Sequence, residues 1–513
     1  MKKNIFKFQI IIIIFIAILS ISLLGQEYEV NEPRQIILTW QNDPQTTMTI
    51  TWRTDQEGEN NTVYYSSEEN INLDEYNKKK ADTSTFEETT AWIHSAELTN
   101  LQPDTIYWVV LESDGYKSEK FCFETAPENS EDLVFIVGSD AQHLQTQMPV
   151  IREVLSKAAK ENPDFFMYSG DIVNAELSEY EWDLFFDLWD ELMITDEGRR
   201  IPIIPTLGNH EVVGGYGGKQ EKAVFYFNRF NVPEPKDYYS IQYGPDLLIL
   251  SLNTDHTSTV DGDQLVWLKE TLKENQNITW IIPQYHDGGW WGSGKINAKI
   301  RSYWLPLFEE YGVDLVHSGH IHFYMRSFPL LGFKNITDKI DNMIDLGIER
   351  AKADFDPDKN YAPPLQKNLL NLSRGKWEET GFSSLEEGLQ ELIYMLSLFV
   401  IQNGEPTNQL VFNQICTTQL FKDYWNTILV EDNSEEMIDE ENGIIYFGVG
   451  GLGASMDPSE KEENPWWLAE SGPIHHYYKV FIDSSNNQLN LTPYFYYPEE
   501  NIWEEGRTDI IIR

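Results

Sequence analysis

Two histidines, His320 and His322, stand one residue apart at the end of the apolar run VDLVHSGHIH, which begins at Val313. The apolar residues are typical of a buried strand, and the glycine before the pair ends the extended run. Both imidazoles are therefore expected at the carboxyl end of a strand, where open α/β sheets place their ligand sites. Because imidazole is a frequent metal ligand, the pair is a candidate for holding a metal ion.

Four other apolar runs also end in a side chain that can bind a metal. The runs LVFIVGSD and DFFMYSGD end in Asp140 and Asp171. The run IPIIPTLGNHE carries Asn209 and His210, and ITWIIPQYHD carries His286. Since Gly, Ser, Asn or Asp residues end each run, every one of these side chains is expected in a turn after a strand.

Segments with helical spacing, 148–160 and 263–274 among them, lie between these runs. An alternation of strand and helix predicts an α/β fold whose strands are joined by helical crossovers. Ligand sites of such sheets lie outside the carboxyl ends of the strands, so we expect the five strand ends to converge on one site.

The side chains of this predicted site offer oxygen and nitrogen donors and no thiolate. Such a set suits hard or borderline ions, with Fe(III) beside a divalent ion as one option. The set is too large for one tetrahedral ion. A carboxylate can bridge two ions, and a pair of ions can hold both the attacking and the leaving oxygen of a phosphoryl transfer. The residues therefore predict a two-metal site for phosphoester chemistry.

Five segments carry a resemblance to a known family. In chain order, GSDAQ, GDIVN, GNHE, the isolated His286 and GHIHFYMR resemble the calcineurin-like metallophosphoesterases. The last segment, from Gly319 to Arg326, is most similar to the purple acid phosphatase branch. The resemblance implies a four-layer α/β/β/α sandwich that hydrolyses phosphoesters with two metal ions.

The family pattern implies a role for each candidate residue. The first metal would be bound by Asp140, Asp171 and His322. The second metal would share Asp171 and add Asn209, His286 and His320. His210 would donate a proton to the leaving oxygen, which is a frequent role of imidazole in catalysis.

Two positions near the first metal depart from the family pattern. Many relatives have a tyrosine that ligates Fe(III) three residues after the bridging Asp, where this chain has Asn174; others have a histidine where this chain has Gln142, followed by His143. A neutral amide is a weaker donor to Fe(III) than a phenolate, so Fe, Zn and Mn all stay open as the bound ions. Asn174, Gln142 or water would complete the first metal's ligands. His317, three residues before the histidine pair, is expected to be structural or to support a ligand.

Three further residues occupy family positions near the site. Tyr324 and Arg326 follow the histidine pair, and Trp290 follows His286 where relatives build the pocket rim. Arg326 can contact a phosphate or form a structural ion pair. Trp290 can stack on an aryl or nucleobase group or pack against a neighbouring loop. Both alternatives stay open.

The chain is strongly acidic. Its 38 Lys and Arg against 83 Asp and Glu give a formal net charge of −45 over 513 residues. This balance argues against nucleic acid and anionic lipid as general partners. A phosphorylated small molecule or another phosphoester would have to be drawn in by local positive charge, which bound metal ions supply.

The first 25 residues combine three lysines with a short apolar run, which is typical of a secretory signal. We therefore expect a secreted or cell-envelope protein, with an uncleaved anchor as the alternative. No second apolar stretch is long enough to predict a membrane span after signal cleavage.

The remaining chain is divided by its patterns. Short alternating strands predict an antiparallel sandwich over 31–127, which resembles a fibronectin type III-like domain. Helical spacing over 333–440 predicts an insertion, for which a lid, an interface and extra core stay open, with extra core the default. The predicted units are a signal peptide (1–25), the fibronectin type III-like domain (31–127), the metallophosphoesterase domain in two parts (131–332 and 441–498), the helical insertion (333–440) and a C-terminal tail (499–513).

These observations favour an exported two-metal hydrolase that cleaves phosphate monoesters by attack of a metal-activated hydroxide, with His210 as proton donor. A phosphodiesterase or nucleotide hydrolase is the alternative within the same ligand set. A cell-surface binding protein with an impaired metal site is the alternative of another class. The sequence leaves the oligomeric state open.

Overall fold

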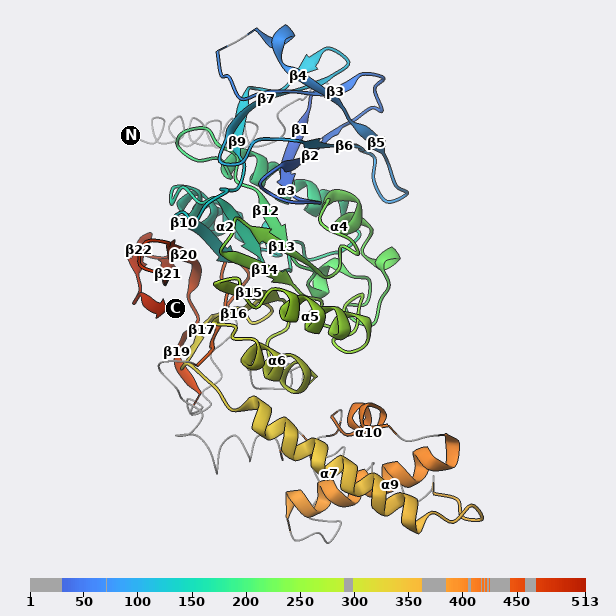
Figure 1. The fold of residues 1–513 in the computed structure, drawn as a ribbon. Helices are drawn as coiled ribbons and strands as arrows, with labels where there is room; N and C mark the ends of the chain where they lie inside the picture. Colours follow the sequence, from blue (N-terminus) through green and yellow to red (C-terminus); the bar gives the residue numbers. More distant parts are fainter. Residues whose placement is uncertain are drawn as a thin grey trace, which may run out of the picture.

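The structure is a computed structural model. In Figure 1 its three units lie one below another: the N-terminal β unit, the two-sheet unit and the helical insertion. Among the described residues, no helix is both long enough and apolar enough to cross a membrane. The described residues are 30–70, 72–289, 299–361, 384–404, 407–416, 418, 420–421, 424, 443–456 and 467–513.

The first unit is an all-β sandwich, as the alternating pattern predicted. One sheet has the strand order β1-β2-β6-β5 and the other the order β4-β3-β7-β8, with β9 paired to β7; all pairs are antiparallel. In β7, Tyr107, Val109 and Leu111 point into the core and alternate with less buried residues. The strands are β1 (Arg34–Thr39), β2 (Thr47–Thr54), β3 (Asn61–Ser66), β4 (Asn77–Lys80), β5 (Asp82–Ser84), β6 (Trp92–Thr99), β7 (Ile106–Ser113), β8 (Tyr116–Lys117) and β9 (Phe121–Glu124).

This sandwich is joined to the next unit through helix α3 (Glu179–Leu192). Arg53 of β2 forms an ion pair with Asp183 of the helix. The backbone N–H of Gln35 donates to Asp190 at 2.9 Å, and its side-chain amide donates to Asp187 at 2.8 Å. The three aspartates are spaced at four and three residues, so they share one face of the helix.

The second unit contains two mixed sheets. The first has the order β12-β11-β10-β20-β21-β22, with β23 paired to β21, and the second has the order β13-β14-β15-β16-β18-β17-β19. The strands of the first sheet are β10 (Leu133–Gly138), β11 (Phe165–Tyr168), β12 (Ile203–Pro205), β20 (His475–Asp483), β21 (Gln488–Tyr497), β22 (Ile502–Glu505) and β23 (Asp509–Ile512). Those of the second are β13 (Tyr239–Tyr243), β14 (Leu247–Ser251), β15 (Trp280–Tyr285), β16 (Leu315–Ser318), β17 (Tyr324–Ser327), β18 (Ile445–Gly448) and β19 (Leu468–Gly472).

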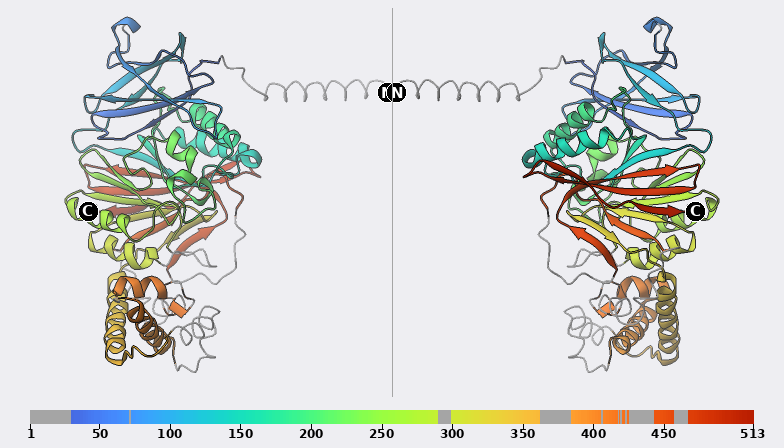
Figure 2. Two further views of the ribbon diagram at one scale, coloured as in Figure 1. Left: turned by 90° about the vertical axis from the view of Figure 1, so that its right-hand side faces the viewer. Right: turned by 90° about the vertical axis from the view of Figure 1, so that its left-hand side faces the viewer.

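The two sheets pack face to face with helices outside them (Figure 2). Residues of β14 alternate between two cores: Leu247 and Ile249 join the core shared with the first sheet, whereas Leu248 and Leu250 join the outer core. A strand with both faces buried must be covered on both sides. Helices α2 (Leu144–Ala159) and α3 cover the first sheet, and α5 (Asp263–Glu274) and α6 (Leu305–Glu310) cover the second. The expected α/β/β/α architecture is therefore confirmed.

Parallel strands bring the candidate residues to one edge. Strands β10, β11 and β12 are mutually parallel in the first sheet, and β14, β15, β16 and β18 are parallel in the second. A parallel pair needs a crossover, and helices α2, α3, α5 and α6 serve as crossovers. The turns after β10, β11, β12, β15 and β16 consequently open on the same side of the unit.

The insertion between β17 and β18 is helical in its described part, as expected. It contains α7 (Phe333–Asp354), α9 (Leu385–Asn403) and α10 (Asn408–Ile415). The helices α7 and α9 cross closely at Gly347, where a Cβ atom would come within 2.4 Å of the Ile393 side chain. Their buried apolar residues are continuous with the outer core of the second sheet. The described helices therefore extend the core, which was the default interpretation.

The last segment differs from the expectation of a tail. Residues 499–513 include β22 and β23, which pair with the two halves of β21. Strand β21 is ten residues long, and without these partners it would expose a long row of unpaired backbone groups at the sheet edge. Pairing of this edge explains why the end of the chain is ordered into strands.

Candidate metal centre

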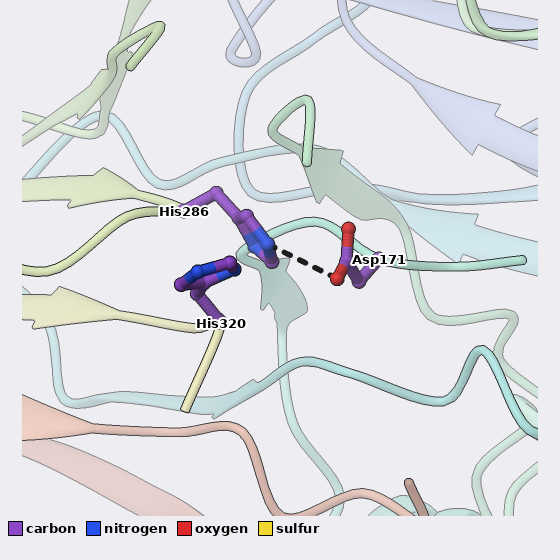
Figure 3. A group of neighbouring side chains, drawn as sticks. All are labelled: Asp171, His286 and His320. Carbon is purple, nitrogen blue, oxygen red and sulfur yellow. Dashed lines mark ion pairs between the residues drawn. The ribbon is translucent and has the colours of Figure 1, made fainter. Parts of the chain in front are cut away.

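The six predicted metal ligands lie together at the carboxyl edge of the two sheets. Figure 3 shows three of them, Asp171, His286 and His320, converging from separate turns. Asp140 follows β10, Asp171 follows β11, Asn209 lies in the short helix η2 (Asn209–Glu211) after β12, His286 follows β15, and His320 and His322 follow β16.

Three of these residues have a left-handed backbone conformation. The φ angles are +65° at Asp140, +55° at Asp171 and +69° at His320. Such angles are uncommon for residues other than glycine and cost about 1–3 kcal/mol each. Here the turns support each other, because Asp140 N–H donates to Gly170 C=O at 3.2 Å and Ala141 N–H donates to Asp171 C=O at 3.0 Å. The paired turns hold two carboxylates side by side.

The ligands form two groups that share one carboxylate. Asp140, Asp171 and His322 form the first group, and Asp171, His286 and His320 form the second; within each group the ligand atoms lie within 4.8 Å of one another. The Asn209 Oδ1 atom lies 3.1 Å from His286 Nε2 and 2.9 Å from His320 Nδ1, so Asn209 joins the second group. Asp171 is thus placed to bridge two ions.

Backbone contacts orient two of the histidines. His286 Nδ1 donates to the Ser169 carbonyl at 2.7 Å, and His322 Nδ1 donates to the Ser455 carbonyl at 3.0 Å. In each ring the other nitrogen, Nε2, is left to face a carboxylate of the site: Asp171 at 3.1 Å for His286 and Asp140 at 3.4 Å for His322. Such contacts behind a ligand determine its tautomer and ring orientation.

Glu211 forms hydrogen bonds to two of the turns that carry predicted ligands. Its carboxylate accepts the backbone N–H groups of Asp171 and Gly208, both at 2.8 Å, and of Ile172 at 2.7 Å. Burial, together with the negative charge of Asp171, raises the pKa of Glu211 to about 7, and the N–H donors oppose this rise. Glu211 therefore links the turn after β11 to the turn after β12.

Charge is tightly paired in the second group. Burial disfavours ionisation of Asp171, but the His286 imidazole offsets this and holds the pKa of Asp171 well below its ordinary value. Burial likewise disfavours the protonated form of His286, but the Asp171 carboxylate raises the pKa of His286 to about 10. The metal-free site is therefore an ion pair in which a proton occupies the ligand nitrogen that a cation requires.

The residues fit a pair of cations. Carboxylate, amide and imidazole donors suit Fe, Zn and Mn. Beside His322, the amide Nε2 of Gln142 lies 2.8 Å from the ring Nε2, while the buried Oε1 of Gln142 has no hydrogen-bond partner within the described residues. Gln142 thus lies beside the first group, and its Oε1 atom could serve as a metal ligand. Asn174, in contrast, is exposed, and its backbone carbonyl accepts a hydrogen bond from His210.

His210 lies at the rim of the site. Its Nδ1 donates to the Asn174 carbonyl at 2.9 Å, and its Nε2 lies 3.9 Å from Asp171 Oδ2. The side chain is 32% exposed, so a substrate can reach it. Its backbone N–H also donates to Asp171 at 2.9 Å. The ring is therefore held at one nitrogen and presents the other to the opening.

His317 lies beneath the centre and outside both ligand groups. Its Nδ1 is 2.8 Å from the Ser169 hydroxyl, and its ring packs against Phe447. Burial lowers the pKa of His317 to about 3, so the ring is neutral. The carbonyl of the same Ser169 accepts the hydrogen bond from the ligand His286. His317 therefore supports a ligand through Ser169, which was one of the two roles expected for it.

Arg326 and Tyr324 do not face the site. Arg326 is buried in an ion pair with Asp509, and Tyr324 donates to Glu470 at 2.7 Å. For Arg326, the structure shows the ion-pair alternative, and the expected substrate contact of Tyr324 is corrected. Strand β17 turns the two side chains toward β23 and β19, respectively. Trp290, the third predicted contact, lies outside the described residues.

Sequence reasoning assigned no individual role to three residues around the second group. Asp287 Oδ1 lies 3.6 Å from His320 Nδ1 and accepts the Tyr216 hydroxyl at 3.3 Å, and the Tyr216 ring lies on His256. Burial raises the pKa of Asp287 to about 7. The available signals were the position of Asp287 directly after His286 and the aromatic in the glycine-rich segment VGGYGGK.

Comparisons with known proteins agree with this geometry. Residues 33–125 match the N-terminal domain of purple acid phosphatases, and residues 135–324 match the calcineurin-like phosphoesterases. An uncharacterised protein of Mycobacterium tuberculosis is 29% identical over 277 residues, which cover 47% of this chain and 51% of that protein. Purple acid phosphatase 21 of Arabidopsis thaliana is 28% identical over 276 residues, which cover 50% of this chain and 60% of the plant protein.

A solved structure extends the likeness of the fold. A purple acid phosphatase from yellow lupin (Lupinus luteus) seeds has a TM-score of 0.62 and 16% identity, covering 94% of this chain and 75% of the lupin chain. The two-sheet domain with its paired ligand groups is a calcineurin-like phosphoesterase domain. Through its N-terminal domain, the chain is also similar to the purple acid phosphatases. It spans about half the length of the curated relatives that it matches.

The affinity of the metal-free protein for the ion of the second group should increase with pH. Because the pKa of His286 lies at about 10, its proton must leave before the ring can bind a cation, so we expect about a tenfold gain per pH unit across neutral pH. Calorimetric titration with Mn²⁺ in buffers of different ionisation enthalpy measures both the affinity and the proton released. An affinity independent of pH, with no proton released, would contradict the ion pair described above.

The Asp509→Asn substitution should destabilise the protein without altering substrate affinity. It leaves the buried Arg326 guanidinium unpaired, which costs about 3 kcal/mol or more. Denaturant unfolding measures the stability, and KM measures the substrate contact; Glu499→Gln, an exposed carboxylate in the same region, is the control. A raised KM at unchanged stability would instead support a phosphate contact by Arg326.

Proposed function

We propose that this protein is an exported, metal-dependent hydrolase of phosphate monoesters. The observation that carries the proposal is the pair of ligand groups sharing Asp171. Two ions bound there would neutralise the substrate phosphate and activate a water molecule as the nucleophile. The named relatives support a phosphatase, because purple acid phosphatases are among them. The lysines and apolar run of residues 1–25 support export.

The chain's own residues supply the other parts of the reaction. Asp140, Asp171 and His322 would hold one ion, and Asp171, Asn209, His286 and His320 the other. With a formal charge of −45, the protein as a whole repels an anionic substrate, so binding depends on the local positive charge of the ions. This dependence makes the loss of either ion costly for substrate binding.

His210 is the proposed proton donor. A leaving alkoxide is a strong base, and an imidazolium at the opening can protonate it as the bond to phosphorus breaks. The hydrogen bond from Nδ1 to Asn174 holds the ring so that Nε2 carries the transferable proton. The proximity of Nε2 to the shared carboxylate, 3.9 Å, keeps this proton beside the ions.

The reaction class is tested with matched substrates. The metal-free protein is loaded with Mn, Zn or Fe and assayed with 4-nitrophenyl phosphate and with bis(4-nitrophenyl) phosphate. We expect the monoester to be hydrolysed with the higher kcat/KM. A preference for the diester would establish a phosphodiesterase, and bound ions without turnover of either ester would establish a binding protein.

The role of His210 is tested by leaving-group dependence. We expect His210→Ala to keep two ions and to lower kcat for phenyl phosphate by about 10²- to 10⁴-fold, because phenolate needs a proton. The loss should be far smaller for 4-nitrophenyl phosphate, whose leaving group is stable as an anion. Equal losses with both substrates would show that His210 acts in some way other than as a proton donor.

A further inference from the structure

The peptide group of Ser455 lies between two imidazoles. Its carbonyl accepts the Nδ1–H of the predicted ligand His322 at 3.0 Å, and its own N–H donates to His143 Nδ1 at 2.8 Å. The two rings are 5.9 Å apart at 87°. His143, which directly follows Gln142, is therefore connected to His322 through one peptide group.

The two hydrogen bonds determine both tautomers. A backbone N–H can only donate, so Nδ1 of His143 must carry a lone pair. A carbonyl can only accept, so Nδ1 of His322 must carry the hydrogen. The lone pair of a neutral His322 is then on Nε2, which lies 3.4 Å from Asp140 Oδ1 in the first ligand group. This is the nitrogen that a metal ion needs.

The segment that contains Ser455 is attached to the turn of Asp140. Ser139 N–H donates to Val449 C=O at 3.0 Å, Leu452 N–H donates to Ser139 C=O at 3.1 Å, and Ala454 N–H donates to Asp140 C=O at 2.9 Å. Gly450 makes the close approach feasible, since a Cβ there would come within 2.2 Å of the Ile321 carbonyl oxygen. Residues 449–455 thus follow the Asp140 turn and end at the two histidines.

The two ligand groups differ in how they are supported. His286 is oriented by Ser169, which lies two residues before the shared Asp171. His322 is oriented by Ser455, which lies in the segment 449–455 that carries none of the six predicted ligands, and His143 accepts the Ser455 N–H. The first group has the neutral amide of Gln142, a weaker donor than a carboxylate or an imidazole. The ligand geometry of the first group therefore depends more on hydrogen bonds to the far side of its ligands than that of the second group does.

We propose that His143 is a positioning residue for the first metal ion. By accepting the Ser455 N–H, it holds the peptide group that turns His322 Nε2 toward the ion. This inference rests on the proposed two-metal function, and it concerns occupancy of the first group rather than hydrolysis. Loss of the His143 acceptor should weaken binding of the first ion by about 10- to 100-fold and leave the second ion in place.

Three substitutions at one position separate the acceptor from the ring. His143→Asn keeps an oxygen acceptor at the place of Nδ1, His143→Gln moves it to the place of Nε2, and His143→Ala removes it. Ser455→Ala is the matched control, since both hydrogen bonds, to His322 and to His143, use only the peptide group of Ser455 and not its side chain. Ions per chain are measured after equilibration at graded free Mn²⁺, and the electron paramagnetic resonance signal of a coupled Mn pair reports simultaneous occupancy.

We expect two ions and the coupled signal in the unaltered protein, in His143→Asn and in Ser455→Ala. We expect one ion and an uncoupled signal in His143→Gln and His143→Ala. The retained second ion shows that these variants are folded; if His143→Ala does not fold, the Asn and Gln pair decides. Unchanged first-ion affinity in His143→Gln would overturn the proposal, and a raised KM at full occupancy would identify a substrate contact instead. Full occupancy without hydrolysis in the unaltered protein would contradict the proposed function only.

Discussion

Burial of one negative charge, that of Asp171, is the constraint on which the rest of the centre depends. The side chain is almost entirely buried, and an isolated carboxylate is very unfavourable in such a place. Its charge is compensated by His286, by the backbone N–H of His210 and, in the proposed enzyme, by two cations. His286 and the His210 N–H come from different turns, so these turns must meet for the charge to be tolerated.

Hydrogen bonds and ion pairs connect the site to residues outside the two sheets. Glu181 of helix α3 accepts the backbone N–H groups of Asn174 and Ala175 at 2.8 and 2.9 Å, and the carbonyl of Asn174 holds His210. Two residues further along the same helix, Asp183 pairs with Arg53 of the all-β domain. The proposed proton donor is therefore connected through one helix to the N-terminal domain.

Arg326 shows where local patterns are insufficient. Arg326 lies four residues after His322, and the resemblance to the family pattern placed it near the site. Its actual partner, Asp509, is 183 residues away on a strand that was expected to be part of a tail. Nothing near Arg326 in the sequence marks this pairing, because the partner of an edge strand is chosen by packing in three dimensions. Asp287 and Tyr216 were assigned no individual role for the same reason, since their significance depends on their distance from His320.

The sequence by itself determined the ligand types, their order and the strand ends that carry them. Apolar runs followed by turn residues are local signals, and the alternation of strand and helix implies that parallel strand ends share an edge. The family resemblance implied that Asp171 is shared. Only the tertiary structure decided that Gln142 rather than Asn174 lies at the first group, and that a peptide group joins His143 to His322. These facts are distances between residues far apart in the chain, and such distances are determined by the packing of the two sheets rather than by any local pattern.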